Sequence, residues 1–235
     1  MCGRYSIYES MDHYFKELAP RLLVINGYDL WPVERYNVVP STRVEIIRPG
    51  RESLSIDKVR WGWAPFWAKG KRPDPINARV ETVITGKFFN QLWPNGRVLA
   101  PANGWFEWVK DEEEPKKKQP YFVTKEQIPM FFAGLAEVHE GMEPNDRDGF
   151  VIITAASDEG MVDIHDRKPL VLSPEHAREW IDPDTSPERA RELALEHCRP
   201  ATDFHWYKVG KEVGNVRSQG PHLIEPTTLP SDVDD

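Results

Sequence analysis

The sequence is poor in cysteine and has no long apolar run. Its two cysteines, Cys2 and Cys198, do not complete a zinc site alone, and no histidine stands at ligand spacing from either. The prediction is a protein without a metal or other cofactor. No stretch is apolar enough to span a bilayer, and residues 1–5 lack the hydrophobic core of a signal peptide. We therefore expect a cytoplasmic protein with two reduced thiols.

The sequence also has no excess of positive charge, and most of its excess negative charge lies in two short segments. The formal net charge is −8, of which residues 111–114 contribute −4 and three aspartates near the C-terminus contribute −3. Both acidic runs have the composition of solvated loops or tails. Because charges are screened over about 8 Å at physiological salt, an arginine cluster elsewhere can still bind phosphate. The net charge therefore does not exclude a nucleic-acid partner.

The hydrophobic pattern predicts one α+β domain over residues 1–226, followed by a disordered acidic tail at 227–235. Many short strands favour a curled, mostly antiparallel sheet, barrel-like in form, with helices at its flanks. Ser-Pro pairs at 173–174 and 186–187 are typical of a helix N-cap followed by a first-turn proline. Strands are expected at 44–48, 56–63, 97–99, 104–110, 119–125, 130–137, 150–155 and 204–209; helices at 9–18, 79–93, 173–181 and 186–198; and loops at 22–40, 64–75, 110–118 and 163–169.

Cys2 is the first residue whose chemistry stands out. Methionine aminopeptidases act when the second residue is small, and loss of Met1 would leave an amine and a thiol on neighbouring carbons of Cys2. An aldehyde forms an imine with such an amine, and the thiol then closes a thiazolidine ring. Because an α-amine has a pKa of about 7.7–8.0, against about 10.4 for lysine, far more of it is nucleophilic at neutral pH. The alternative is that Cys2 is only a small residue that permits removal of Met1.

Residues 104–108, Gly-Trp-Phe-Glu-Trp, place a carboxyl group among aromatic side chains. On a strand, Trp105 and Glu107 share one face, while Phe106 and Trp108 share the other. Burial at such a position raises the pKa of a carboxyl group and suits it to acid–base catalysis. The alternative is a surface glutamate on an aromatic strand.

Residues 163–169 set a histidine among acids and bases. His165 can shuttle protons near neutral pH, and Arg167 can hold a phosphate. The alternative is a salt-bridged turn.

Two further segments offer polar side chains. In residues 75–82, Asn77 and Arg79 can face one cleft if the segment is extended; the alternative is a helix start capped by Asn77. In residues 35–40, Asn37 can bind a backbone or substrate amide; the alternative is an ordinary turn residue.

Seven motifs occur together along the chain. They are Met-Cys-Gly-Arg (1–4), Arg-Tyr-Asn-Val-Val-Pro (35–40), Trp-Gly-Trp-Ala-Pro (61–65), Ile-Asn-Ala-Arg-Val-Glu-Thr (76–82), Gly-Trp-Phe-Glu-Trp (104–108), Asp-Ile-His-Asp-Arg-Lys-Pro (163–169) and Gly-Asn-Val (214–216). In this combination the sequence resembles the SOS response-associated peptidase family, over residues 1 to about 226. Val39 stands where alanine is expected, which is a conservative change, and the insert at 111–118 touches no motif.

The resemblance implies covalent capture of abasic sites in single-stranded DNA, through an imine and then a thiazolidine, as part of the DNA damage response. Cys2 would be the nucleophile, and Asn37 would hold its terminus and the abasic sugar. Glu107 would be the acid–base residue, and His165 would stabilise or protonate the opened deoxyribose. DNA binding is implied for Arg4, Trp67, Asn77, Arg79, Trp108 and Arg167.

The same resemblance implies secondary activities and a setting. Abasic-site lyase activity would accompany capture, and the peptidase activity in the family's name would be self-removal of Met1 or reversal of the link. The protein is expected to act as a monomer, away from membranes, and at the nucleoid if it is bacterial.

Two other functions fit parts of the sequence. Glutamine amidotransferases also begin Met-Cys-Gly and use the cysteine to attack an amide, although an apolar residue usually stands where Arg4 follows here. Release of ammonia from glutamine would select that function. A plain single-strand-binding module, with Cys2 incidental, would bind intact and abasic strands equally and form no adduct.

Overall fold

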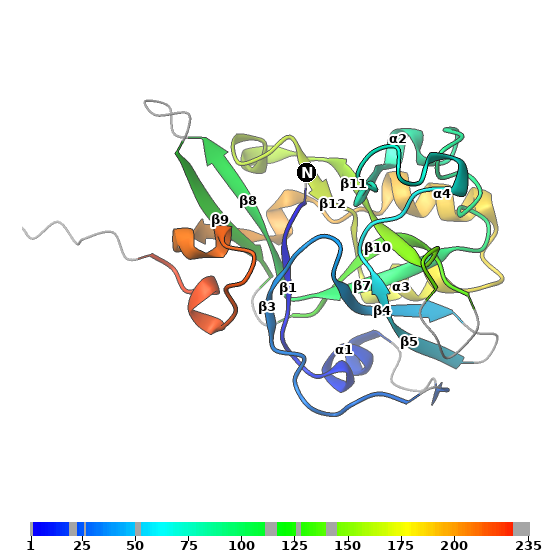
Figure 1. Cartoon of the computed structure of the whole chain (residues 1–235), viewed down its shortest axis with the longest axis horizontal. Coiled ribbons are helices and arrows are strands. Elements are labelled where there is room, and N and C mark those ends of the chain that lie inside the picture. Colours follow the sequence, from blue (N-terminus) through cyan, green and yellow to red (C-terminus); the bar gives the residue numbers. More distant parts are fainter. Residues whose placement is uncertain are drawn as a thin grey trace, which may run out of the picture.

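The protein is built around two β-sheets (Figure 1). The computed structural model describes residues 2–18, 23–25, 27–49, 53–110, 117–125, 128–139 and 145–227. The larger sheet has the order β12 (Arg167–Pro169), β11 (Gly149–Ala156), β10 (Met130–Glu137), β7 (Arg97–Ala102), β4 (Arg43–Pro49), β5 (Ser53–Arg60), β2 (Leu23–Val24), with β6 (Asn77–Arg79) beside β11 and β13 (Val171–Leu172) beside β10. The smaller sheet has the order β14 (His205–Lys208), β9 (Lys118–Thr124), β8 (Gly104–Lys110), β1 (Tyr5–Ile7), β3 (Arg35–Val38).

These sheets confirm the predicted α+β class with mostly antiparallel strands. Among the strands of the described residues, only β2–β5 and β6–β11 pair in parallel, and one isolated parallel bridge joins Trp61 to Phe150. Both sheets curl, but neither closes into a barrel, because β12 and β2 end the larger sheet and β14 and β3 end the smaller one. The barrel-like form expected from the sequence is therefore limited to this curvature.

The main core lies between the sheets and the helices, and a second, smaller cluster lies on the other side of β8. Alternation along β8 explains both. Trp105 points into the main core, whereas Phe106 joins the second cluster with Phe122 and Val213. Gly104 is required where β8 meets β9, since a Cβ atom there would lie 2.2 Å from the Phe122 ring. Glu107 consequently returns to the Trp105 side of the strand.

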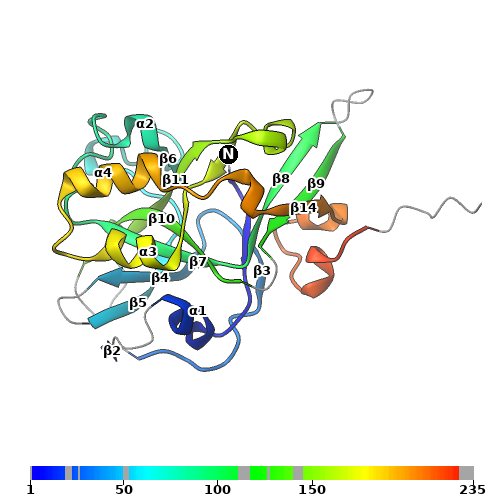
Figure 2. The same ribbon diagram turned by 180° about the vertical axis from the view of Figure 1, so that it is seen from behind.

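Few helices cover the sheets. α1 (Met11–Leu18) buries residues spaced three and four apart, as an amphipathic helix does. α3 (Pro174–Ile181) packs on β7 and β10 and contacts α4 (Pro187–Glu196), as Figure 2 shows. The predicted caps are confirmed, because the Ser173 and Ser186 side chains accept hydrogen bonds from backbone amides three residues later.

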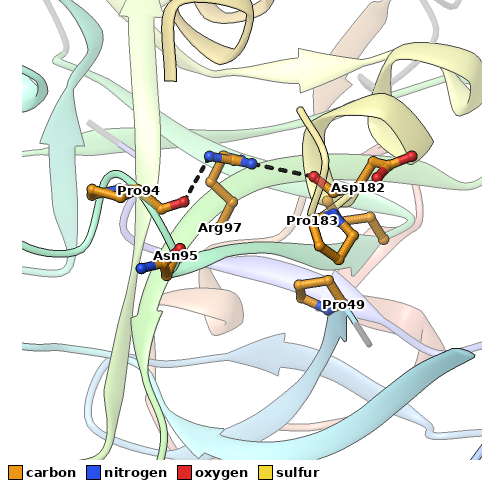
Figure 3. A pocket seen from close by; sticks show the side chains of 7 residues that line it. Pro49, Pro94, Asn95, Arg97, Asp182 and Pro183 are labelled. Atoms are coloured by element: carbon orange, nitrogen blue, oxygen red, sulfur yellow. Dashed lines mark hydrogen bonds between the residues drawn. The ribbon is translucent and has the colours of Figure 1, made fainter. Parts of the chain in front are cut away.

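Arg97 ties α3 to the larger sheet. Its guanidinium lies beside a cavity of about 280 Å³ between Pro49 and Pro183 (Figure 3). The side chain is 4% exposed and donates hydrogen bonds to five backbone carbonyls, those of Trp93, Pro94, Trp180, Asp182 and Thr185. Its donors are thus used within the protein, and the cavity presents no free cation to a ligand.

Several predicted boundaries are wrong, including those of the strands expected at 56–63 and 97–99, which are found at Ser53–Arg60 and Arg97–Ala102. The loop expected at 22–40 contains β3, which the sequence pattern missed because pairing with β1 stabilises it. The helix expected at 79–93 is limited to α2 (Val80–Val83), after which the chain forms turns. The loop expected at 163–169 ends in β12, which pairs with β11. Most of the predicted 110–118 loop and all but the first residue of the acidic tail lie outside the described residues.

No helix among the described residues is long and apolar enough to cross a membrane.

Candidate functional site

The N-terminal segment places Cys2 inside the protein. β1 lies between β3 and β8, with Tyr5 opposite both Val38 and Trp105. The Phe106 amide continues this pairing by donating to the Arg4 carbonyl at 3.0 Å. Cys2 therefore lies just beyond the start of β1, beside β8 (Figure 1), and it is fully buried.

Asn77 holds the backbone of Cys2. This residue opens β6, and its side-chain amide donates to the Cys2 carbonyl at 2.8 Å. The side-chain oxygen of Asn77, Oδ1, is buried and makes no hydrogen bond within the described residues. One end of the side chain therefore fixes Cys2, while the other remains available to a donor.

The Cys2 thiol is protonated at neutral pH. Burial, and then the Glu107 carboxylate, raises the pKa of this thiol well above its usual range. Since the thiolate is the nucleophile, reaction at sulfur requires a base that removes the proton as the bond forms.

Glu107 is the group placed to handle that proton. Its side chain comes from β8, is almost fully buried, and faces the Trp105 side of the strand. Burial raises the pKa of Glu107 to about 8, so most of it carries a proton at neutral pH. A buried carboxyl group that is protonated near pH 7 can donate a proton and then take one back.

His165 lies next to Glu107. The two side chains approach to 4.0 Å between His165 Nε2 and Glu107 Oε2, and burial lowers the pKa of His165. The Arg167 amide donates to His165 Nδ1 at 3.0 Å, which assigns the proton of the neutral ring to Nε2. Asp166 Oδ1 is 2.9 Å from the same Nδ1, a contact that becomes a hydrogen bond when Nδ1 carries a proton. The neutral imidazole therefore directs an N–H group toward the Glu107 side.

Asn37 and Arg4 form a different unit. Asn37 is fully buried, and its amide nitrogen donates to three carbonyls of the segment 213–218. Its Oδ1 atom accepts from Arg4 at 2.9 Å, and Arg4 also donates to the Val213 carbonyl. The structure thus joins these two predicted site residues to the C-terminal segment, while the contact with Cys2 is made by Asn77.

The other predicted DNA-binding residues divide into exposed and buried ones. Arg79 is exposed, Trp67 is 57% exposed, and the half-buried Trp108 ring has the Arg4 guanidinium 5.8 Å from its centre. Arg167, in contrast, is 8% exposed.

Arg167 forms a bidentate ion pair with Glu81, at 2.6 and 3.0 Å, and donates to the Thr154 carbonyl. Its guanidinium is therefore engaged within the protein, and its phosphate-binding role stays a prediction. Sequence reasoning missed Glu81 as its partner, although Glu81 stands in the same motif as Asn77.

Comparisons with known proteins identify the family of the chain. A family model described as SOS response associated peptidase (SRAP) matches residues 1–216. Abasic site processing protein YedK of Escherichia coli (strain K12) is 44% identical over 231 residues, covering 96% of this chain and 100% of that protein. Abasic site processing protein YoqW of Bacillus subtilis (strain 168) is 32% identical over 229 residues, covering 96% and 99% respectively.

A solved structure agrees with the sequence matches. A phage-related protein from Bordetella bronchiseptica has a TM-score of 0.74 and 36% identity, and the match covers 88% of this chain and 94% of that one. The matched length of the family model includes the segments that bring Cys2, Glu107 and His165 together. The chain belongs to the SOS response-associated peptidase family.

Proposed function

We propose that this protein captures abasic sites in single-stranded DNA by a covalent bond to Cys2, after removal of Met1. The curated relatives are named abasic site processing proteins, which supports the substrate. The observation that carries the chemistry is a fully buried Cys2 just before β1, the strand paired with β8, whose buried Glu107 lies 4.0 Å from His165 Nε2. Burial, and then the charge of Glu107, raises the pKa of the thiol, so the reaction at sulfur needs a group that takes its proton.

The first step is imine formation. The free amine of Cys2 adds to the C1′ aldehyde of the opened sugar, and protonated Glu107 gives its proton to the departing hydroxyl, which leaves as water. An α-amine suits this step because its pKa of about 7.7–8.0 leaves part of it neutral at physiological pH. Glu107 is left as a carboxylate beside an iminium ion.

The second step closes the ring. The Glu107 carboxylate takes the proton of the Cys2 thiol, and the sulfur attacks the iminium carbon to form a thiazolidine. Glu107 recovers its proton, so the net reaction releases one water molecule and involves no oxidation or reduction. The Nε2–H group of His165 is suited to stabilising the ring oxygen as the closed hemiacetal opens, a step that acid–base assistance typically accelerates roughly 10²–10⁴-fold.

Other outcomes compete with ring closure. The imine makes β-elimination of the 3′ phosphate accessible, so weak lyase activity would accompany capture. The peptidase activity named for the family would be self-removal of Met1 or reversal of the link. We propose that one copy of the chain acts alone, in the cytoplasm, and at the nucleoid in a bacterium.

Exposed and half-buried side chains would bind the strand. Arg79 is exposed and would contact phosphate, and the Trp67 and Trp108 rings offer surfaces on which bases can stack. Asn77 would orient Cys2 through its carbonyl. Arg4, Asn37 and Arg167 would act through the segments they hold, because each donates hydrogen bonds from its side chain to other groups of the protein.

Substitution of Cys2 tests the proposal. The wild type should form a heat-stable adduct with an abasic oligonucleotide on a denaturing gel, and C2A should form none. C2S retains the amine but lacks the thiol, so its adduct should survive only after borohydride reduction. C198A is the matched control and should behave as the wild type, since the free thiol of Cys198 has no free α-amine beside it and cannot close a thiazolidine. An unchanged adduct in C2A would refute the mechanism, and mass spectrometry of the wild type should find Cys2 as the first residue.

A further inference from the structure

A small cavity opens beside an exposed aromatic turn. The 3₁₀ turn η1 (Phe66–Ala68) forms one wall of a cavity of about 160 Å³. Aromatic, basic and acidic side chains line it. The residues that matter for its chemistry are Phe66, Trp67, Lys69, Gln91, Glu137 and Arg147.

Two aromatic rings stand at the mouth of this cavity. Phe66 is 78% exposed and Trp67 is 57% exposed, a large apolar area to leave in water. Trp67 packs edge-on against Phe88, and the Arg147 guanidinium lies 5.4 Å from the centre of the Phe66 ring. Exposed rings next to cations form the kind of platform on which the bases of single strands stack.

Glu137 gives the cavity a fixed carboxylate. Its Oε2 atom accepts a hydrogen bond from Trp63 Nε1 at 2.8 Å. His139 Nδ1 lies 2.8 Å from Asp148 Oδ1, while its Nε2 lies 3.7 Å from Glu137 Oε1, which is too far for a hydrogen bond. Within the described residues no hydrogen bond to Oε1 is formed, and about one third of the Glu137 side chain is exposed. An acceptor is thus held open at the cavity.

The cavity lies within reach of a strand that enters the Cys2 site. Asn77, Ile152 and Gly134 are aligned across β6, β11 and β10, and Glu137 lies three residues beyond Gly134. With strands about 4.8 Å apart and a rise of about 3.3 Å per residue, the backbones of Asn77 and Glu137 are roughly 14 Å apart. A few nucleotides of single strand cover that distance.

We propose that this cavity binds one nucleobase of the captured strand and selects bases that carry an exocyclic amino group. The inference rests on the proposed function and adds sequence preference to it. The base would stack on Trp67 or Phe66, and its amino group would donate to Glu137 Oε1, the pairing a carboxylate makes with cytosine N4. Uracil and thymine place a carbonyl oxygen at that position, which the carboxylate repels.

The test compares cytosine, which has an amino group at C4 and an acceptor at N3, with uracil, which has a carbonyl oxygen at C4 and a proton on N3. Two oligonucleotides carry the same tetrahydrofuran abasic analogue, which forms no adduct, and either cytosine or uracil at all other positions. Fluorescence anisotropy should give about tenfold tighter binding of the cytosine strand to the wild type, the expectation for one good base contact. E137Q, whose amide can donate to a carbonyl oxygen, should lose the preference.

Controls separate this subsite from the adduct chemistry. E175Q removes an exposed glutamate on α3 and should keep the tenfold preference. Equal affinity of the wild type for both strands, or a preference that persists in E137Q, overturns the subsite. A natural abasic oligonucleotide is run with the wild type on a denaturing gel in parallel. No adduct there contradicts the proposed function, whereas an adduct without base preference contradicts the subsite alone.

Discussion

At the scale of single residues, the protonation of Glu107 controls the proposed reaction. Burial raises its pKa to about 8, and the proton it carries below that pH is the one that imine formation uses. The capture rate of the wild type should therefore fall as pH rises through about 8, although the Cys2 amine becomes more nucleophilic. E107Q should be roughly 10²–10⁴-fold slower and should lack this alkaline decline. Single-turnover gel assays across the neutral and mildly alkaline range measure both.

The stability of the same variant provides an independent check. A carboxyl group has a pKa of about 4.3 in the unfolded chain, so between that pH and about 8 the folded protein binds the extra proton at Glu107. This residue consequently lowers the free energy of unfolding as pH rises through that window. E107Q should melt at a higher temperature than the wild type at about pH 8.5 and show no such gain at about pH 4. A higher melting temperature of the wild type than of E107Q at about pH 8.5 would contradict a buried carboxyl group with a raised pKa.

Individual residues also show how far a candidate site is predictable from sequence. Residues two apart on a strand share a face, so the position of Glu107 relative to Trp105 followed from its spacing. The hydrogen-bond partners of Asn37 and Asn77 could not be predicted from spacing in this way. Both side chains are amides in loop-like motifs, and which backbone each one faces depends on strand pairings between distant segments.

At the scale of elements, the same limit applies. β8 and β10 begin and end where the sequence predicts, because each has alternating or continuous apolar residues bounded by clear breaks. β1 and β3 are only three and four residues long, and their strand form depends on pairing with each other. Local composition cannot reveal such strands, yet β1 positions Cys2.

The Asn37 clamp predicts a local effect on the C-terminal segment. Asn37 donates to three carbonyls in residues 213–218, and each such hydrogen bond contributes about 1 kcal/mol. Because the Asn37 amide has only two protons to share among these carbonyls, N37A should destabilise this segment by about 2 kcal/mol. Hydrogen exchange of the amides of Asn215 and Ser218 should then accelerate about 30-fold. Exchange in β10, a strand of the larger sheet, is the internal reference. Unchanged exchange at 213–218 would mean that packing alone holds the segment.

At the scale of the whole molecule, one buried arginine joins the layers. Arg97 extends from β7 and binds carbonyls at the C-terminal end of α3 and in the turn before β7. These carbonyls would lose their donors in R97M, and a buried unsatisfied acceptor costs about 1–3 kcal/mol. We expect a loss of about 3 kcal/mol in the free energy of unfolding, which lowers Tm by roughly 10 °C in a chain of this size. R217M replaces an exposed arginine and should leave Tm unchanged. If R97M has the same Tm as R217M, other donors in the cavity of Figure 3 satisfy these carbonyls. The apolar face of α3 on β7 would then be what holds the helix.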